Sequence, residues 1–202
     1  VNMSGPFGSS QWMYNAGGGF YPTTIDNSLR FVPSSDTNLR RILNGNRQKF
    51  TVSFWYKRSG TSEQQIFTSG SSAAGFVVAS DQLEFFNYSG GYQIRVRPTA
   101  KLRDNSSWYH IVARIDTTQS TASNRVRIYI NGDRQTAFTH STYPSQNYST
   151  IWNNNTTHRI GHNISGGQDV DGYLADFIFT DGVSNDVTAF GERKSGVWIP
   201  KE

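Results

Sequence analysis

Apolar and polar residues alternate with a period of two through five stretches of the chain. In the first stretch the alternation places Phe50, Val52, Phe54 and Tyr56 on one face. Successive side chains of a β-strand point to opposite faces, so this pattern predicts half-buried strands. The five stretches are FTVSFWYKR (50–58), QIRVR (93–97), WYHIVARID (108–116), RVRIYING (125–132) and YLADFIFTD (173–181).

In the fifth stretch, strict alternation predicts that Tyr173, Ala175, Phe177 and Phe179 share one face. Weaker strands are predicted at Ser28–Val32, Gln65–Thr68, Phe76–Ala79, Gln82–Tyr88, Gln135–Phe138 and Arg159–His162.

Turn signals separate these strands at short intervals. Asn131-Gly132 directly follows an apolar alternation and predicts a tight hairpin. The only helical signal is one turn in SNDVTAFGE, with Ser184 or Asn185 as the cap. Ten or more short strands without a long helix predict an all-β fold, either a sandwich or a jelly roll.

The pattern divides the chain into an N-terminal arm, residues 1–26, and one large domain, residues 27–202. The arm is rich in glycine, yet Trp12, Tyr14, Phe20 and Tyr21 make it too apolar for a free tail. We expect these four side chains to pack on the domain or on a neighbouring chain. A long loop with aromatic residues is predicted at His140–Thr157.

Composition narrows the classes of function. The chain of 202 residues has no cysteine, which excludes disulfides, thiolate zinc sites and thiol catalysis. No apolar run approaches 18 residues, so we expect no membrane insertion, and no signal peptide is visible. The net charge of +4 permits an acidic partner without requiring one.

Two Arg-Val-Arg segments raise the question of a basic patch. Arg95 and Arg97 lie in one predicted strand, and Arg125 and Arg127 lie in another. If the four side chains share a face, they form a patch for an anionic glycan or a nucleic acid. Otherwise they are solvated strand faces whose charge discourages edge pairing. We favour the second interpretation and expect no nucleic-acid partner.

Three segments resemble laminin-G-like domains, which have the concanavalin A-like jelly roll. They are FTVSFWYKRSG (50–60), WYHIVARIDTTQSTASNRVRIYINGDRQTAF (108–138) and HRIGHNISGGQDVDGYLADFIFTDG (158–182). The resemblance covers roughly Ser28 to Pro200 and implies a jelly-roll sandwich of two antiparallel sheets.

Three other segments are similar to such domains in virion proteins of tailed bacteriophages: TIDNSLRF, YPSQNYSTIWNNNTTHRIG and FGERKSGVWIPKE. This resemblance implies a structural or adhesive role on a virus particle assembled in the host cytoplasm, as a head decoration or a fibre. The implied partners are other virion proteins and further copies of the chain, and a host-surface glycan is left open. Related domains continue past VWIPK, so a trimmed fragment is left open as well.

The residues of a concanavalin A-like glucanase are missing. Such enzymes carry Glu-x-Asp-x-x-Glu on one strand, and none of the four glutamates has these partners. Asp81 and Glu84 are three apart and therefore on opposite faces of a strand. We expect no catalytic residue and no enzymatic activity. A free lectin module is the main alternative function, and a glycoside hydrolase with a site built from distant residues is a remote one.

Two residue pairs invite a metal interpretation. His158 and His162 would align on a helix, but on a strand they lie about 13 Å apart, too far to share zinc. Asp169 and Asp171 belong to the turn before the last long strand, where the sequence leaves calcium open. We expect no other cofactor.

A carbohydrate site needs an aromatic platform with hydrogen-bonding groups beside it. Trp152 with Asn153 and Asn154 offers one candidate, and Tyr88 with Tyr92 offers another. The alternative is that these loop aromatics cover the rim of the core.

Overall fold

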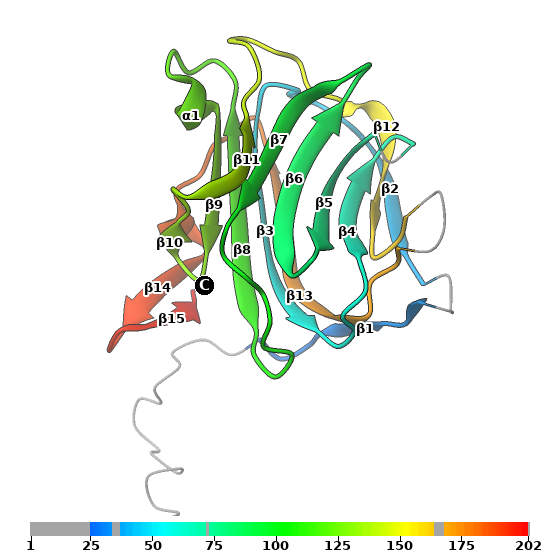
Figure 1. Ribbon diagram of the computed structural model, residues 1–202, viewed down its shortest axis with the longest axis vertical. Helices are drawn as coiled ribbons and strands as arrows, with labels where there is room; N and C mark the ends of the chain where they lie inside the picture. The colour runs from blue at the N-terminus through cyan, green and yellow to red at the C-terminus, as the bar shows by residue number, and fades with distance from the viewer. Residues whose placement is uncertain (1–24, 34–36, 72, 164–167, 202) are drawn as a thin grey trace, which may run out of the picture.

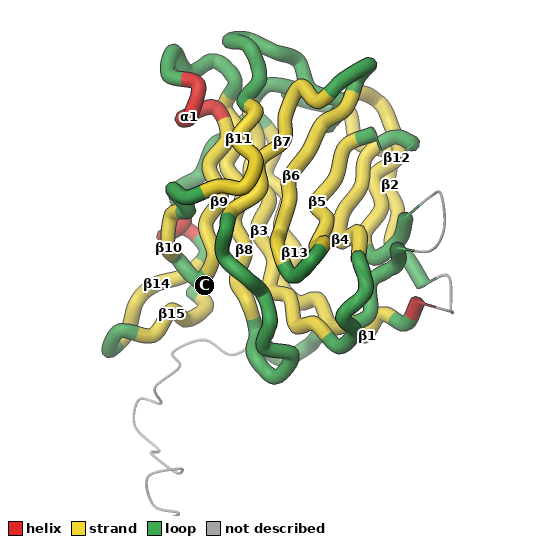
Figure 2. Tube along the Cα trace, in the orientation of Figure 1, coloured by secondary structure: helices red, strands yellow, loops and turns green. Residues whose placement is uncertain are grey.

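The computed structural model describes residues 25–33, 37–71, 73–163 and 168–201 (Figures 1 and 2). Strands make up most of it, and its helical elements include the short helix α1 (Ala122–Arg125) and the 3-10 turn η3 (Val187–Ala189). The first eight strands are β1 (Leu29–Phe31), β2 (Leu39–Asn44), β3 (Lys49–Arg58), β4 (Gln64–Ser69), β5 (Ala74–Ala79), β6 (Gln82–Tyr88), β7 (Tyr92–Pro98) and β8 (Tyr109–Asp116). The others are β9 (Val126–Ile130), β10 (Asp133–Arg134), β11 (Phe138–Thr142), β12 (Asn154–Ile160), β13 (Gly172–Asp181), β14 (Gly191–Lys194) and β15 (Val197–Pro200).

The strands form two large sheets that face each other. One sheet has the order β1-β13-β3-β8-β9-β10, and the other has the order β11-β7-β6-β5-β4-β12-β2. Figure 1 shows the seven-stranded sheet in front of the six-stranded one. Neighbouring strands within both sheets pair antiparallel. The predicted jelly-roll sandwich is therefore confirmed.

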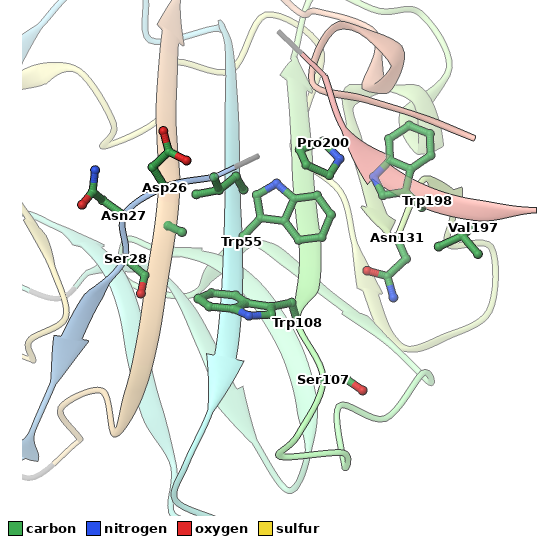
Figure 3. Close-up of a pocket in the computed structure, with 12 residues that line it drawn as sticks. Asp26, Asn27, Ser28, Trp55, Ser107, Trp108, Asn131, Val197, Trp198 and Pro200 are labelled. Carbon is green, nitrogen blue, oxygen red and sulfur yellow. The ribbon is translucent and has the colours of Figure 1, made fainter. Parts of the chain in front are cut away.

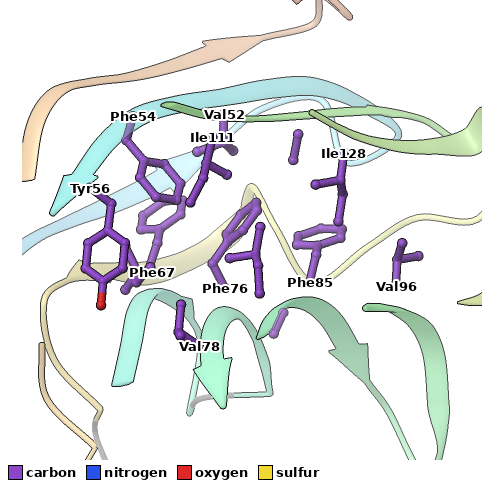
Figure 4. Close-up of a cluster of buried hydrophobic side chains, with 14 of the residues drawn as sticks. Val52, Phe54, Tyr56, Phe67, Phe76, Val78, Phe85, Val96, Ile111 and Ile128 are labelled. Atoms are coloured by element: carbon purple, nitrogen blue, oxygen red, sulfur yellow. The ribbon is translucent and has the colours of Figure 1, made fainter. Parts of the chain in front are cut away.

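The core lies between the two sheets, as the alternating pattern predicted. The face of β3 that was predicted to be buried has no solvent exposure; it carries Phe50, Val52, Phe54 and Tyr56. Phe54 meets Phe76 of the opposite sheet edge to face, with ring centroids 5.8 Å apart. Figure 4 shows the apolar side chains of the two sheets meeting in this layer. Burial of these large side chains is the main force that holds the sheets together.

The prediction that Tyr173, Ala175, Phe177 and Phe179 share one face of β13 is wrong, because the strand changes face in its middle. The pairing register of β13 on β3 shifts between Ala175 and Ile178, where Asp176 takes a positive φ of 48°. Such a bulge adds one residue to the strand and exchanges its faces. As a result, Leu174 and Phe179 both point into the core, whereas Ala175 and Ile178 lie on the outer face.

Four other local predictions have outcomes in the structure. The Asn131-Gly132 hairpin is confirmed, with positive φ at both residues. The predicted helical turn is the 3-10 turn η3, but its cap is Asp186, whose side chain accepts a hydrogen bond from the backbone N–H of Thr188. The strand predicted at 135–138 begins only at Phe138, and the one predicted at 159–162 is the end of β12. Strand β2 was not predicted, because as an edge strand it exposes apolar and charged residues alike.

The C-terminal segment packs against the outer face of the six-stranded sheet. Val187 and Phe190 join Val112 and Tyr129 in a second, smaller apolar cluster, against which Ile178 and Trp198 also pack. The hairpin of β14 and β15 continues along this face (Figure 1). The outer face of this sheet is therefore partly covered, and the C-terminal segment stands above the uncovered part beside it. No helix in the described part of the chain is long and apolar enough to cross a membrane.

Candidate functional site

Trp152, the predicted carbohydrate platform, is a core residue. Its side chain has no solvent exposure, and its ring lies 4.8 Å from that of Phe67 and 5.9 Å from that of Phe85. The ring has no free face for a sugar, which corrects the prediction made for Trp152. Trp152 therefore belongs to the hydrophobic core between the two sheets and not to a binding surface.

Of the two asparagines that follow Trp152, Asn153 is buried and Asn154 is exposed. The side-chain nitrogen of Asn153 donates to the backbone oxygen of Asn46 and to a carboxylate oxygen of Asp181, at 3.0 and 2.9 Å. Asn153 is buried, so its amide ties the loop to the sandwich. Asn154 begins β12 and is exposed. The structure therefore does not bring Trp152, Asn153 and Asn154 together as one open site.

Tyr88 and Tyr92 lie on the surface at the hairpin between β6 and β7. Their exposed fractions are 48% and 43%, and their rings meet edge to face with centroids 5.3 Å apart. The guanidinium of Arg95 lies over the Tyr92 ring, 4.5 Å from its centroid. This pair is accessible to a ligand.

The two pairs considered for metals have separate environments. His158 is buried in β12, whereas Nδ1 of His162 lies 2.8 Å from a carboxylate oxygen of Asp169. Asp171 forms an ion pair with Arg30 at 2.7 Å. Thus Asp169 and Asp171 have different partners. Among the described residues, no three or more His, Asp or Glu side chains are grouped so as to hold a metal ion.

The four arginines of the Arg-Val-Arg segments do not form one patch. Arg95 and Arg97 are on β7 in the seven-stranded sheet, and both lie beside Glu84. Arg127 is on β9 in the other sheet, while the Arg125 side chain donates to three backbone oxygens of nearby loops. The four side chains therefore do not share one face, and Arg125 lies at the end of α1 and not in the strand predicted for it.

A cleft of about 740 Å³ on the outer face of the six-stranded sheet brings three tryptophans together. We call it the tryptophan cleft. Trp55 comes from β3, Trp108 from the residue before β8, and Trp198 from β15 (Figure 3). The polar residues in its lining are Asp26, Asn27, Ser28, Ser107 and Asn131. Its size and its mixture of aromatic and polar groups are typical of small-molecule sites.

Two glycines allow Trp198 to form one wall of this cleft. A Cβ atom on Gly132 would lie 2.3 Å from the indole, and one on Gly191 would lie 2.5 Å from it. Gly132 also has a φ of +81°, which side chains rarely adopt. The Asn131-Gly132 turn therefore serves both the hairpin and the close approach of the indole.

His110 links the tryptophan walls beneath the cleft. Its ring stacks on Trp55 with centroids 4.6 Å apart, and its Nδ1 accepts a hydrogen bond of 2.8 Å from Nε1 of Trp198. Burial lowers the pKa of His110 to about 4, so the ring is neutral at pH 7. With Nδ1 accepting, the proton must reside on Nε2, which donates to Oγ of Ser53 at 2.9 Å. In this tautomer His110 cannot take the Ser53 proton as a general base.

Trp55 has one polar atom that no described residue satisfies, as does Trp152 in the core. The indole Nε1–H of Trp55 is buried and has no hydrogen-bond partner among the described residues. A buried donor without an acceptor is costly, and an acceptor oxygen on a bound molecule would remove that cost.

Sequence reasoning missed the tryptophan cleft, although β3 holds one signal of it. The face of β3 opposite the core carries Thr51, Ser53, Trp55 and Lys57. A tryptophan on an otherwise polar face indicates a second packed or ligand-binding surface. No comparable pattern marks Trp108 or Trp198.

Comparison with known families identifies the superfamily of the chain. The model of the concanavalin A-like lectin/glucanases superfamily matches residues 32–186. No curated protein sequence matches the chain.

Solved structures align with this chain at low sequence identity. A heptameric pentraxin of Limulus polyphemus aligns with a TM-score of 0.55 and 16% identity, over 86% of this chain and 91% of that chain. Domain 4 of an extracellular arabinanase from Geobacillus stearothermophilus aligns with a TM-score of 0.42 and 14% identity, over 77% of this chain and 76% of that chain. At such identities, the likeness to the pentraxin shows a common fold alone.

Proposed function

The chain belongs to the concanavalin A-like lectin/glucanase superfamily, and from this premise we propose that it is a non-enzymatic domain that binds a carbohydrate in the tryptophan cleft. The observation that carries the proposal is the convergence of Trp55, Trp108 and Trp198 on one cleft that also has polar groups in its lining.

The chemistry of the cleft suits a sugar. One face of a pyranose ring presents C–H groups, which are attracted to the negative π-face of an indole. The hydroxyls need hydrogen-bonding partners, which Asn27, Ser107 and Asn131 supply in the lining.

A binding role without turnover is supported by the state of the polar groups. The tautomer of His110 leaves Ser53 without a base, and Ser53 itself is buried. Glu84 is held between Arg95 and Arg97, while Asp81 pairs with Arg58. These carboxylates are engaged separately, whereas a glycosidase needs two that face one sugar.

We place this domain on the particle of a tailed bacteriophage, as a structural or adhesive part. The segments TIDNSLRF and FGERKSGVWIPKE, with their similarity to virion domains, support this setting. In such a role the cleft would hold a glycan of the host surface. Several copies on one particle would convert modest affinity into strong attachment.

Self-association is part of this proposal. The edge strands β1 and β2 belong to different sheets, yet both carry exposed apolar side chains, Leu29 on β1 and Leu39 and Ile42 on β2. Exposed apolar edges are typical of surfaces that pair with another chain. A solution mass above that of one chain supports the oligomer, and a monomer at micromolar concentration contradicts it.

A glycan array followed by titration of the best ligand tests the binding proposal. Trp108→Ala should weaken binding by about 10- to 30-fold, equivalent to about 1.4–2 kcal/mol, because truncation of a stacking aromatic removes a dominant contact. Tyr92→Ala is the matched control, since it truncates an exposed aromatic outside the cleft. Binding of no glycan on the array would refute the proposal.

The Tyr88–Tyr92 pair is the second candidate site, favoured by its accessibility. If Tyr92→Ala abolishes binding while Trp108→Ala leaves it unchanged, the glycan binds at this hairpin instead. Release of reducing sugar from the bound glycan by purified protein would support the hydrolase alternative and contradict a purely binding role.

A further inference from the structure

A second hollow, of about 340 Å³, opens on the outer face of the six-stranded sheet and is lined by three cations and one carboxylate, that of Asp116. Lys49 comes from β3, Arg114 from β8 and Arg127 from β9, so adjacent strands supply all three. Gly182, Val183 and Ser184, where the C-terminal segment leaves β13, complete one wall. We call this hollow the cationic pocket.

The sheet register separates the cationic pocket from the tryptophan cleft. On the outer face of β8, Arg114 lines the cationic pocket, Val112 lies two residues before it, and His110 lies two residues earlier still, under the tryptophan cleft. Val112 is covered by Val187 and Phe190 of the C-terminal segment. The segment therefore crosses the middle of this face, with one hollow on each side.

Arg114 and Arg127 are direct cross-strand neighbours in the pairing of β8 with β9. Side chains at such positions have Cβ atoms about 5 Å apart, and like charges there repel. The Nε–H group of each arginine is buried without a hydrogen-bond acceptor among the described residues. Two unsatisfied donors on like charges side by side are unfavourable, and Asp186 offsets only the charge of Arg114.

Carboxylates balance only part of this charge. Lys49 lies 3.6 Å from Asp116, and Arg114 lies 2.9 Å from Asp186 and also donates to the backbone oxygen of Ser184. Asp116 is engaged further by Thr118 and Gln119. The Arg127 side chain has no hydrogen bond or ion pair with any part of the chain that the structure describes.

We propose that the cationic pocket binds an oxyanion group, a sulfate or phosphate, between the Arg114 and Arg127 guanidiniums. A planar guanidinium presents paired N–H donors that match two oxygens of such a group. The oxyanion would accept from guanidinium N–H groups that line the pocket and would offset the unpaired charge of Arg127. The ligand is either a free ion or a substituent on a polysaccharide, and the pocket is independent of the tryptophan cleft.

Arginine side-chain NMR tests this directly. Sodium sulfate is titrated against sodium chloride at constant ionic strength, and the Nε–Hε resonances of Arg114 and Arg127 should shift saturably. Calorimetry then compares dextran sulfate with uncharged dextran. Saturable binding of sulfate alone identifies a free ion, whereas tighter binding of dextran sulfate identifies a polymer-borne group; both support the site.

The key variant is Arg127→Gln, and Arg103→Gln is its control because it removes the same charge from an exposed side chain outside the pocket. Arg127→Gln should bind the oxyanion at least about 10-fold more weakly, and Arg103→Gln should match the wild type. Because Arg127→Gln also removes the repulsion with Arg114, its unfolding temperature without ligand should be equal or higher. The proposal would be overturned if the Arg127 resonances did not shift with sulfate. It would also be overturned if the two variants lost the same affinity, or if uncharged dextran bound as tightly as dextran sulfate.

Discussion

Nε1 of Trp198 donates a hydrogen bond of 2.8 Å to Nδ1 of His110, and this contact joins the last strand of the chain to the six-stranded sheet. It holds a cleft wall in place through a histidine that must stay neutral. Protonation of Nδ1 would set two N–H donors against each other. The geometry of the cleft is thus linked to the charge of one buried ring.

Acid should therefore weaken both the fold and the cleft. Burial lowers the pKa of His110 from 6.5 in the unfolded chain to about 4 in the folded one. As the pH falls from 6.5 to 4, the unfolded state takes up a proton that the folded state excludes. The free energy of unfolding should fall by on the order of 3 kcal/mol, and above pH 6.5 this group should contribute no pH dependence.

Urea unfolding at a series of pH values measures this loss, and NMR titration of the His110 ring identifies its source. Burial also lowers the pKa of His158, so its contribution has the same sign. A His110 ring that titrates near pH 6.5 in the folded protein would contradict the prediction.

Gly132→Ala should destabilise the protein more than Gly196→Ala. Both glycines have similar positive φ values, +81° and +83°, so both variants carry the same backbone strain of about 1–2 kcal/mol. Only at Gly132 would the new Cβ collide with the Trp198 indole. Thermal unfolding of the two variants isolates the cost of that collision, and equal losses would show that the indole moves freely.

Arg58→Ala should cost about 3–5 kcal/mol of unfolding free energy. The Arg58 side chain is 1% exposed, pairs with Asp81 at 2.6 Å and donates to the backbone oxygen of Leu102. Arg103 also approaches Asp81, at 3.7 Å, but is 71% exposed. Arg103→Ala should cost less than about 1 kcal/mol by denaturant titration, since exposed pairs contribute little. Similar losses would mean that burial of Arg58 is unimportant.

Trp152→Ala should lower the free energy of unfolding by about 3–5 kcal/mol, because it leaves a cavity in the core. Trp152→Phe should lower it less, since a ring remains in place and Nε1 of Trp152 has no hydrogen bond to lose. Glycan affinity of the folded Trp152→Phe protein should equal that of the wild type. Chemical denaturation and glycan titration measure the two effects. A selective loss of glycan affinity would restore Trp152 as a ligand contact.

The sequence was sufficient to predict the fold because alternation over a strand reports directly which side chains are buried. The core face of β3, from Phe50 to Tyr56, and the turn at Asn131-Gly132 were both predicted from a few neighbouring residues. Asp176 shows the limit of this reasoning, since one bulge residue exchanges the faces of β13 without changing the local composition.

Only the tertiary structure decided where function can reside. Trp152 has the local sequence of a loop aromatic, yet the gap between the sheets accepts its ring and buries it. Trp55, Trp108 and Trp198 are far apart in the chain, and their convergence requires both the pairing of β3 with β8 and the return of the C-terminal hairpin. Periodicity reports which side of a strand a residue occupies. It does not report what later packs against that side, because that packing is set by contacts between segments distant in sequence.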